Sequence, residues 1–178
     1  MNVLESDERL SALLESTQTV AVVGIKDRQS EDAFRIPLYL QRAGYRIVPV
    51  NPKFETVLDE ACHPSLANAS GPIDLVNLFR ASEHVPGHVD EILALEPRPK
   101  AVWMQLGIHH GESAQRLRDA GIDVIQDRCI MVDHRRLLGG SPQSAEREGS
   151  EALRQTTEHP RSTERRRPTE HRRPTEST

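Results

Sequence analysis

Apolar residues in the first 140 positions alternate between two periods. Short runs of consecutive aliphatic and β-branched residues predict parallel strands that are buried on both faces; they cover residues 19–24, 46–50, 73–79, 101–105 and 122–126. Between these runs, apolar residues recur at helical spacing, which predicts amphipathic helices; these segments are residues 1–16, 32–43, 84–95 and 111–120.

This alternation of strands and helices predicts an α/β fold. We expect a Rossmann-like, doubly wound parallel five-stranded sheet with helices on both faces and right-handed crossovers. The expected strand order, counted along the chain, is 3-2-1-4-5. Ligands of such sheets bind beyond the carboxyl ends of the strands, where the strand order reverses. The residues that follow each predicted strand are therefore the candidates for a site.

A change of composition near Gly140 divides the chain into two predicted parts, a folded domain over residues 1–140 and a disordered, low-complexity tail over residues 141–178. The tail is rich in Arg, Glu, Pro and Thr, and its few apolar residues cannot offset the entropy lost on ordering. A six-residue unit that begins with Thr-Glu recurs within it from residue 157. Both a solvated tail and an arginine-rich arm for nucleic acid or acidic partners remain open as interpretations.

Composition narrows the possible partners. The formal net charge of −4 is unlike that of a typical nucleic-acid binder, so we expect no nucleic-acid partner except through the tail. No apolar run approaches the roughly 18 residues that span a membrane, and the acidic N-terminus does not resemble a targeting segment, so a cytoplasmic location is expected. Two cysteines without paired spacing and scattered histidines predict neither a metal site nor a disulfide.

The segment after the first strand offers an anion site. Gly24 and Ile25 form a turn, and the basic residues Lys26, Arg28 and Arg35 stand before or inside the next helix. Free amides at a helix N-terminus attract anions, and basic side chains strengthen that field. These residues are candidates for holding phosphate, although a glycine after a buried strand is also compatible with a simple tight turn.

The later strand ends add further candidates. An NAD site places an acidic residue after the second strand, but this chain has Asn51, Pro52 and Lys53 there. A lysine at this place suits an additional ribose phosphate, as in coenzyme A or NADP. A stiff turn with a solvated lysine is the alternative interpretation. Arg80 lies just beyond the third strand, where packing does not explain an arginine. After the fourth strand, a glycine lets a ligand approach the backbone. The full set of candidates at these two later ends is Phe79, Arg80, Gln105 and Gly107.

These segments resemble a known family. The matching segments are Val22–Gly24, Asn51–Lys53, Cys62–Leu66, Asp74–Arg80, Trp103–Ile108 and Asp127–Cys129. In order and spacing they resemble the small stand-alone CoA-binding domain proteins, similar to the CoA-binding domain of the succinyl-CoA synthetase alpha subunit, over roughly residues 5–138. The resemblance implies a Rossmann-like CoA-binding fold.

The resemblance also implies roles for the candidate residues. Gly24, Ile25 and Lys26 would hold phosphate, Asn51, Pro52 and Lys53 would lie near the adenosine and its phosphate, and the residues after strands three and four would flank the ligand. This chain departs from the family where Lys26 replaces a serine and Glu31 replaces an arginine. Lys26 and Arg28 would then supply positive charge to the phosphate site.

We therefore expect a module that binds coenzyme A or acyl-CoA without catalytic machinery of its own. Three alternatives stay open: an NADP-linked oxidoreductase, a partner subunit of an acyl-CoA synthetase, and an interaction protein that acts through its arginine-rich tail. Cys129, after the fifth strand, lies at the same predicted edge as the site. A mixed disulfide with the CoA thiol and simple structural burial are both possible roles for it.

Overall fold

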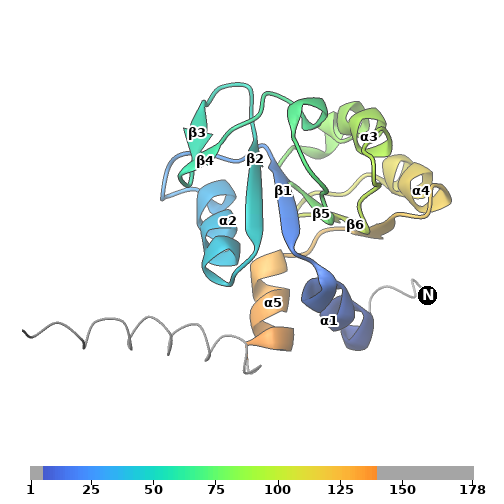
Figure 1. Cartoon of the computed structure of the whole chain (residues 1–178). Helices are drawn as coiled ribbons and strands as arrows, with labels where there is room; N and C mark the ends of the chain where they lie inside the picture. Colours follow the sequence, from blue (N-terminus) through green and yellow to red (C-terminus); the bar gives the residue numbers. More distant parts are fainter. Residues whose placement is uncertain (1–5, 140–178) are drawn as a thin grey trace, which may run out of the picture. The chain divides into compact units, whose positions relative to one another are not determined.

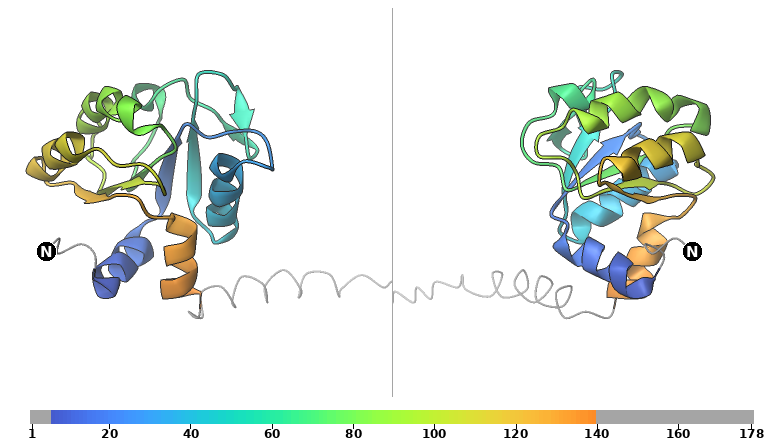
Figure 2. Two further views of the ribbon diagram at one scale, coloured as in Figure 1. Left: turned by 180° about the vertical axis from the view of Figure 1, so that it is seen from behind. Right: turned by 90° about the vertical axis from the view of Figure 1, so that its right-hand side faces the viewer.

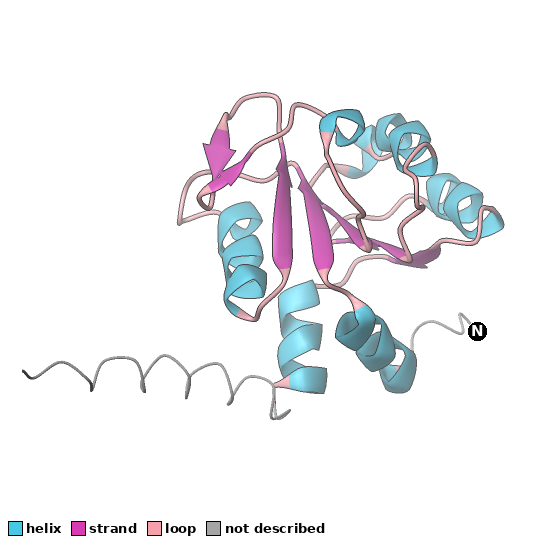
Figure 3. Ribbon diagram, in the orientation of Figure 1, coloured by secondary structure: helices cyan, strands magenta, loops and turns pink. Residues whose placement is uncertain are grey.

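The structure is a computed structural model that describes residues 6–139. The predicted tail, residues 141–178, lies outside the described residues, and so does the predicted boundary at residue 140. Within the described part, all five predicted strands form one parallel sheet with helices on both faces (Figures 1 and 3). The expected fold class is confirmed.

The strands of the sheet lie in the order β2-β1-β5-β6-β7. Their bounds are Arg46–Val50 for β2, Thr19–Val23 for β1, Leu75–Leu78 for β5, Ala101–Met104 for β6 and Asp123–Ile125 for β7. Each of the three central strands is buried along its whole length. Strands covered on both faces have no polar side to present, which is why they read as continuous apolar runs.

Two apolar cores lie on opposite faces of the sheet. Helices α3 (Pro86–Leu93) and α4 (Gly111–Asp119) pack on one face, and α1 (Asp7–Ser16), α2 (Asp32–Arg42) and α5 (Ile130–Leu138) pack on the other, as Figure 2 shows. Alternate residues of each strand belong to the first core, and apolar residues between them belong to the second, which includes the fully buried Trp103. The doubly wound arrangement therefore has a separate core for each face.

The expected strand order was wrong. The third strand, β5, pairs with β1 instead of lying outside β2, so the order in chain terms is 2-1-3-4-5. Pro49 provides the physical reason, because proline has no amide hydrogen to donate and is confined to edge strands. The Pro49 carbonyl points outward and accepts the His63 amide at 2.9 Å, and the His63 carbonyl accepts the Asn51 amide at 2.9 Å. The segment around His63 thus occupies the outer edge of β2.

Several elements were not predicted. Strands β3 (Thr56–Val57) and β4 (Glu60–Ala61) form a small antiparallel hairpin, and 3-10 turns occupy Leu66–Asn68 (η2) and Ser82–His84 (η3). Helix α5 was also missed. The predicted helix over 84–95 begins later and ends earlier, as α3. No helix of the described residues is long and apolar enough to cross a membrane.

Candidate functional site

Gly24 joins the end of β1 to the end of β5. Its backbone has a φ of 84°, and a Cβ atom placed on it would lie 2.5 Å from the Phe79 carbonyl oxygen. Its amide donates to the Val50 carbonyl at 2.9 Å. A side chain here would meet both a strained conformation and a backbone clash. The glycine is therefore required by a close approach of three strand ends, which is more than a tight turn.

The loop from Gly24 to α2 is closed by a proline inside the helix. Pro37 lacks the amide that would bond to the Ala33 carbonyl four residues earlier, and that carbonyl instead accepts the Lys26 amide at 3.2 Å. The Lys26 amide is therefore already used by the fold. The amides of Asp32 and Ala33 in the first turn of α2 donate no hydrogen bond within the described residues, so they remain open to an anion.

Asn51 holds the first loop against the end of β2. It is 3% exposed, its Nδ2 donates to the Ile25 carbonyl at 2.8 Å, and its Oδ1 accepts the Lys53 amide at 3.0 Å. Both ends of its amide are thus engaged by backbone groups. Asn51 acts as a positioning residue, while the side chains of Pro52 and Lys53 beside it are exposed.

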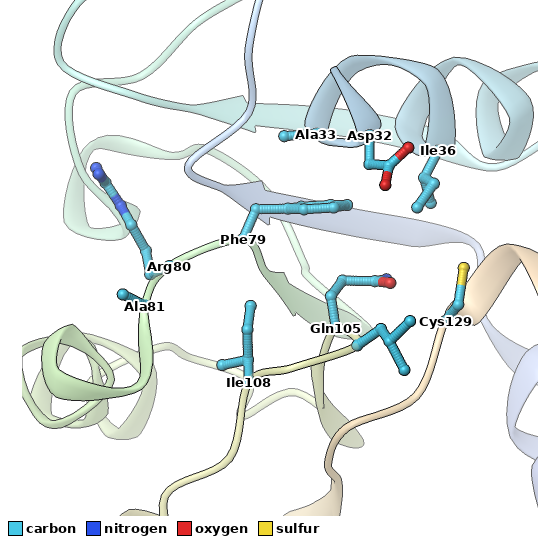
Figure 4. A pocket seen from close by; sticks show the side chains of 10 residues that line it. Asp32, Ala33, Ile36, Phe79, Arg80, Ala81, Gln105, Ile108 and Cys129 are labelled. Carbon is cyan, nitrogen blue, oxygen red and sulfur yellow. The ribbon is translucent and has the colours of Figure 1, made fainter. Parts of the chain in front are cut away.

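A pocket of about 290 Å³ lies beyond the carboxyl ends of β1, β5 and β6 (Figure 4). Its lining comes from the first turn of α2, the residues after β5, the residues after β6 and the start of α5: Asp32, Ala33, Ile36, Phe79, Arg80, Ala81, Gln105, Leu106, Ile108 and Cys129. The strand order reverses between β1 and β5, which is where open α/β sheets bind ligands. The lining is mainly apolar, with three polar side chains.

Arg80 stands at one end of the pocket and Cys129 at the other, with Phe79 and Gln105 between them (Figure 4). Three arginines of the described residues are partly buried. Arg128 pairs with Asp133 at 2.7 Å and Arg118 donates to a carbonyl. The side chain of Arg80 makes no hydrogen bond or ion pair with any residue in 6–139, and its Nε is buried without a partner there. Leaving a partly desolvated cation unpaired is costly, so the site is suited to an anion.

Gln105 forms the polar floor of the pocket. It is 3% exposed, and its Nε2 donates to Oδ1 of the fully buried Asn77 at 2.9 Å. Neither the Gln105 Oε1 nor the Asn77 Nδ2 has a partner within the described residues. Gln105, which lines the pocket, therefore offers its Oε1 as an acceptor for an N–H group of a ligand.

The loops after β6 and β7 are joined to each other beside the pocket. Gly107, with a φ of 80°, donates its amide to Oδ1 of Asp127 at 2.6 Å, and the Asp127 amide donates to the Ile108 carbonyl at 3.0 Å. These bonds fix the start of α5, so that the N-cap residue Cys129 lines the pocket. The predicted location of this thiol at the site edge is thus confirmed, while its chemistry stays a prediction.

The structure brings together only some of the predicted site residues. Phe79, Arg80 and Gln105 line the pocket, and Gly107 is flanked by two lining residues. The other predicted residues do not line the pocket: Gly24, Ile25 and Asn51 are buried, and the remaining five are Lys26, Arg28, Arg35, Pro52 and Lys53. Arg35 forms an ion pair with Asp32, which places a carboxylate at the pocket rim. The positive charge of Arg35 is therefore already partly compensated.

Comparison with known proteins identifies the family. The model of a family described as CoA binding domain matches residues 18–135. The chain belongs to this CoA-binding domain family. The uncharacterized protein YneT of Bacillus subtilis is 38% identical over 129 residues, which are 72% of this chain and 94% of YneT. The resemblance inferred from the sequence is confirmed.

Solved structures agree with this assignment. A protein of Thermus thermophilus is 41% identical with a TM-score of 0.72, covering 75% of this chain and 99% of that one. A hypothetical protein of Pyrococcus horikoshii is 32% identical with a TM-score of 0.72, over 75% of this chain and 93% of its own. A dinucleotide-forming acetyl-coenzyme A synthetase of Candidatus Korarchaeum cryptofilum shares the fold, with a TM-score of 0.56 and 22% identity. The match covers 28% of the chain of that synthetase.

Proposed function

We propose that this protein is a cytoplasmic module that binds coenzyme A or an acyl-CoA and carries out no catalysis of its own. The observation that carries the proposal is Arg80, a partly buried arginine with no hydrogen bond or ion pair to the described part of the chain, in a pocket where the strand order reverses. Membership of the CoA-binding domain family supports the choice of ligand. A nucleotide phosphate is an anion that matches the planar donor fork of an arginine at this place.

The pocket accounts for part of such a ligand. Its volume of about 290 Å³ lies at the lower end of the range typical for small-molecule sites. Its apolar walls and the Gln105 amide suit the uncharged thiol end, with its amides and any acyl group. The exposed Lys53 is left for a phosphate on the adenosine ribose. The ligand would therefore extend from the pocket across the end of β1 toward β2.

NADP, the ligand of the alternative oxidoreductase, also carries a phosphate on its adenosine ribose. Lys53 alone therefore does not distinguish NADP from CoA. The apolar walls around Phe79 and Ile108 favour the flexible thiol arm of CoA over a charged nicotinamide ring. A partner subunit of an acyl-CoA synthetase would bind the same ligand. Copurification of a second chain under native conditions would favour that alternative.

Isothermal titration calorimetry with CoA, dephospho-CoA, NADP and NAD tests the proposal. Each charge-assisted contact contributes on the order of 1.5–3 kcal/mol, so we expect Lys53→Ala to weaken CoA binding roughly ten- to hundredfold and to leave dephospho-CoA, which lacks the ribose phosphate, nearly unaffected. Arg80→Gln should weaken the binding of both CoA and dephospho-CoA. Arg42→Ala, an exposed arginine near the end of α2, is the matched control and should change neither. Preference for NAD or NADP would overturn the proposal.

A further inference from the structure

One of the two cysteines of the chain, Cys129, lines the pocket. It is partly buried, and its side chain makes no cap hydrogen bond at the start of α5. Figure 4 shows its sulfur at the end of the pocket opposite Arg80. The thiol is therefore placed where a ligand in the pocket can reach it.

Bonds around Arg128 fix the position of this thiol. The Arg128 amide donates to the Met104 carbonyl at 3.4 Å, and the Arg128 carbonyl accepts Nε1 of Trp103 at 2.8 Å. Its guanidinium pairs with Asp133 of α5 at 2.7 Å, and the carbonyl of Cys129 accepts the Asp133 amide at 3.1 Å. The thiol is thus anchored between β6 and α5, as a group that reacts with a bound ligand needs.

A second group in the pocket suits the part of CoA next to its thiol. Gln105 is 3% exposed, and its Oε1 accepts no hydrogen bond within residues 6–139. Figure 4 shows the amide end of Gln105 directed toward the end of the pocket that holds the Cys129 sulfur. In CoA, two methylene groups separate the sulfur from the nearest amide nitrogen. A Gln105 that accepts this N–H would bring the CoA sulfur to Cys129.

We propose that the pocket positions a CoA disulfide for thiol–disulfide exchange with Cys129, which retains one CoA as a mixed disulfide. The inference rests on the proposed function and differs from it in the oxidised state of the ligand. The Cys129 thiolate attacks one sulfur of the CoA disulfide, and the new S–S bond forms as the old one breaks. The second CoA leaves as a thiolate and takes up a proton, which balances the proton that Cys129 has given up. Cys129 is oxidised and the leaving CoA is reduced, so no other oxidant is needed.

The surroundings of Cys129 suit this exchange. The amides of Ile130 and Met131 in the first turn of α5 donate no hydrogen bond within the described part of the chain. Open amides at a helix N-terminus favour negative charge, which the attacking sulfur carries. Leu106, which lines the same pocket, is 72% exposed, so the pocket is open to solvent on this side and the second CoA can leave.

Cys62 is a matched internal control. It does not line the pocket, and its Sγ donates to the Asn51 carbonyl at 3.5 Å. Burial raises the pKa of the Cys62 thiol, whereas exchange needs the thiolate. Cys62 therefore lacks both the position and the charge state that the reaction requires.

Intact-mass analysis of the reduced full chain after incubation with CoA disulfide tests the proposal. We expect one adduct, with the mass of one CoA less two hydrogen atoms, that dithiothreitol removes. The adduct should be lost in Cys129→Ser and kept in Cys62→Ser. Peptide mapping of the wild type identifies the modified cysteine directly, so the result does not depend on how the variants fold.

The rate of modification distinguishes a positioned reactant from a merely reactive thiol. CoA disulfide should modify Cys129 at least about tenfold faster than oxidised glutathione, which has no nucleotide. Desulfo-CoA, which has no thiol to exchange, should occupy the pocket and slow the reaction. Arg80→Gln should slow it in proportion to its loss of CoA affinity, and the exposed control Arg42→Ala should not.

Two failures are distinguishable. Tight CoA binding without an adduct on Cys129, or with an adduct that forms equally fast with oxidised glutathione and despite desulfo-CoA, overturns the exchange and leaves the proposed function standing. A wild-type protein that binds neither CoA nor dephospho-CoA overturns both.

Discussion

Substitution of Gly24 by alanine tests whether the close approach of the strand ends holds the site together. An added Cβ would lie 2.5 Å from the Phe79 carbonyl oxygen and 3.2 Å from Cδ of Arg80, at a φ of 84°. The first of these atoms belongs to the backbone, so it cannot move away by a change of rotamer. Either β5 shifts away from β1 at its carboxyl end, or the loop after β1 does.

The expected cost has two parts. A left-handed conformation costs an alanine about 1–2 kcal/mol, and insertion of a methyl group into a filled space costs about 1–3 kcal/mol more. Gly121 is the matched control, because its φ is 81° and a Cβ placed there meets nothing within 4 Å. Gly121→Ala should therefore lose only the conformational part, whereas Gly24→Ala should lose about 2–5 kcal/mol in total.

Urea denaturation of the wild type and the two variants gives the free energies of unfolding directly. At roughly 4 °C per kcal/mol for a domain of this size, Gly24→Ala should also melt clearly below Gly121→Ala. Where the Gly24→Ala variant still folds, it should bind CoA more weakly than Gly121→Ala, because the displaced atoms carry the pocket residues Phe79 and Arg80. Equal destabilisation by the two substitutions would falsify the argument from the close approach.

Two further predictions concern pH and the tail. Burial lowers the pKa of His134, whose Nδ1 is 2.8 Å from the Tyr39 hydroxyl, so the unfolded chain binds a proton more readily than the folded one. The contribution of His134 to the free energy of unfolding is complete above about pH 6.5 and should be lost as the pH falls through the pKa of the folded protein. Chemical denaturation at pH 7.5 and at pH 5 should therefore show a smaller decrease in the free energy of unfolding for His134→Gln than for the wild type. Removal of residues 141–178, which contain almost no apolar side chains, should change neither the melting temperature nor CoA affinity measured by calorimetry, and a melting point several degrees lower would contradict this.

The strands could be predicted from the sequence because burial on both faces leaves no polar positions in them. Helix α5 could not, because its charged residues are paired with residues outside the helix: Asp133 is buried against Arg128, just before the helix, at 2.7 Å, and Arg136 bonds Asp7 of α1 at 2.8 Å. A sequence pattern shows only that these side chains are charged. That the charges compensate each other is decided by the folded structure, and for Arg136 by a contact with the far end of the chain.

The site was predictable where it follows a strand directly. Phe79, Arg80 and Gln105 come immediately after β5 or β6, so a parallel sheet brings them to one edge. Ile36 and Leu106 also line the pocket but were missed. Ile36 lies on the second turn of a helix whose orientation depends on packing, and Leu106 is 72% exposed, which its apolar side chain does not suggest.

Two missing backbone amides explain why the pocket forms where it does. Without an amide hydrogen on Pro49, β2 is confined to the sheet edge, so the chain must return past β1 and the reversal of strand order falls between β1 and β5. Without an amide hydrogen on Pro37, the Ala33 carbonyl is left for the Lys26 amide, which ties the loop after β1 to the first turn of α2 at that same reversal. Both prolines can be seen in the sequence, but each acts through the partner that takes the vacated position. The location of the site therefore depends on the missing amide hydrogens of Pro37 and Pro49 as well as on the side chains that line the pocket.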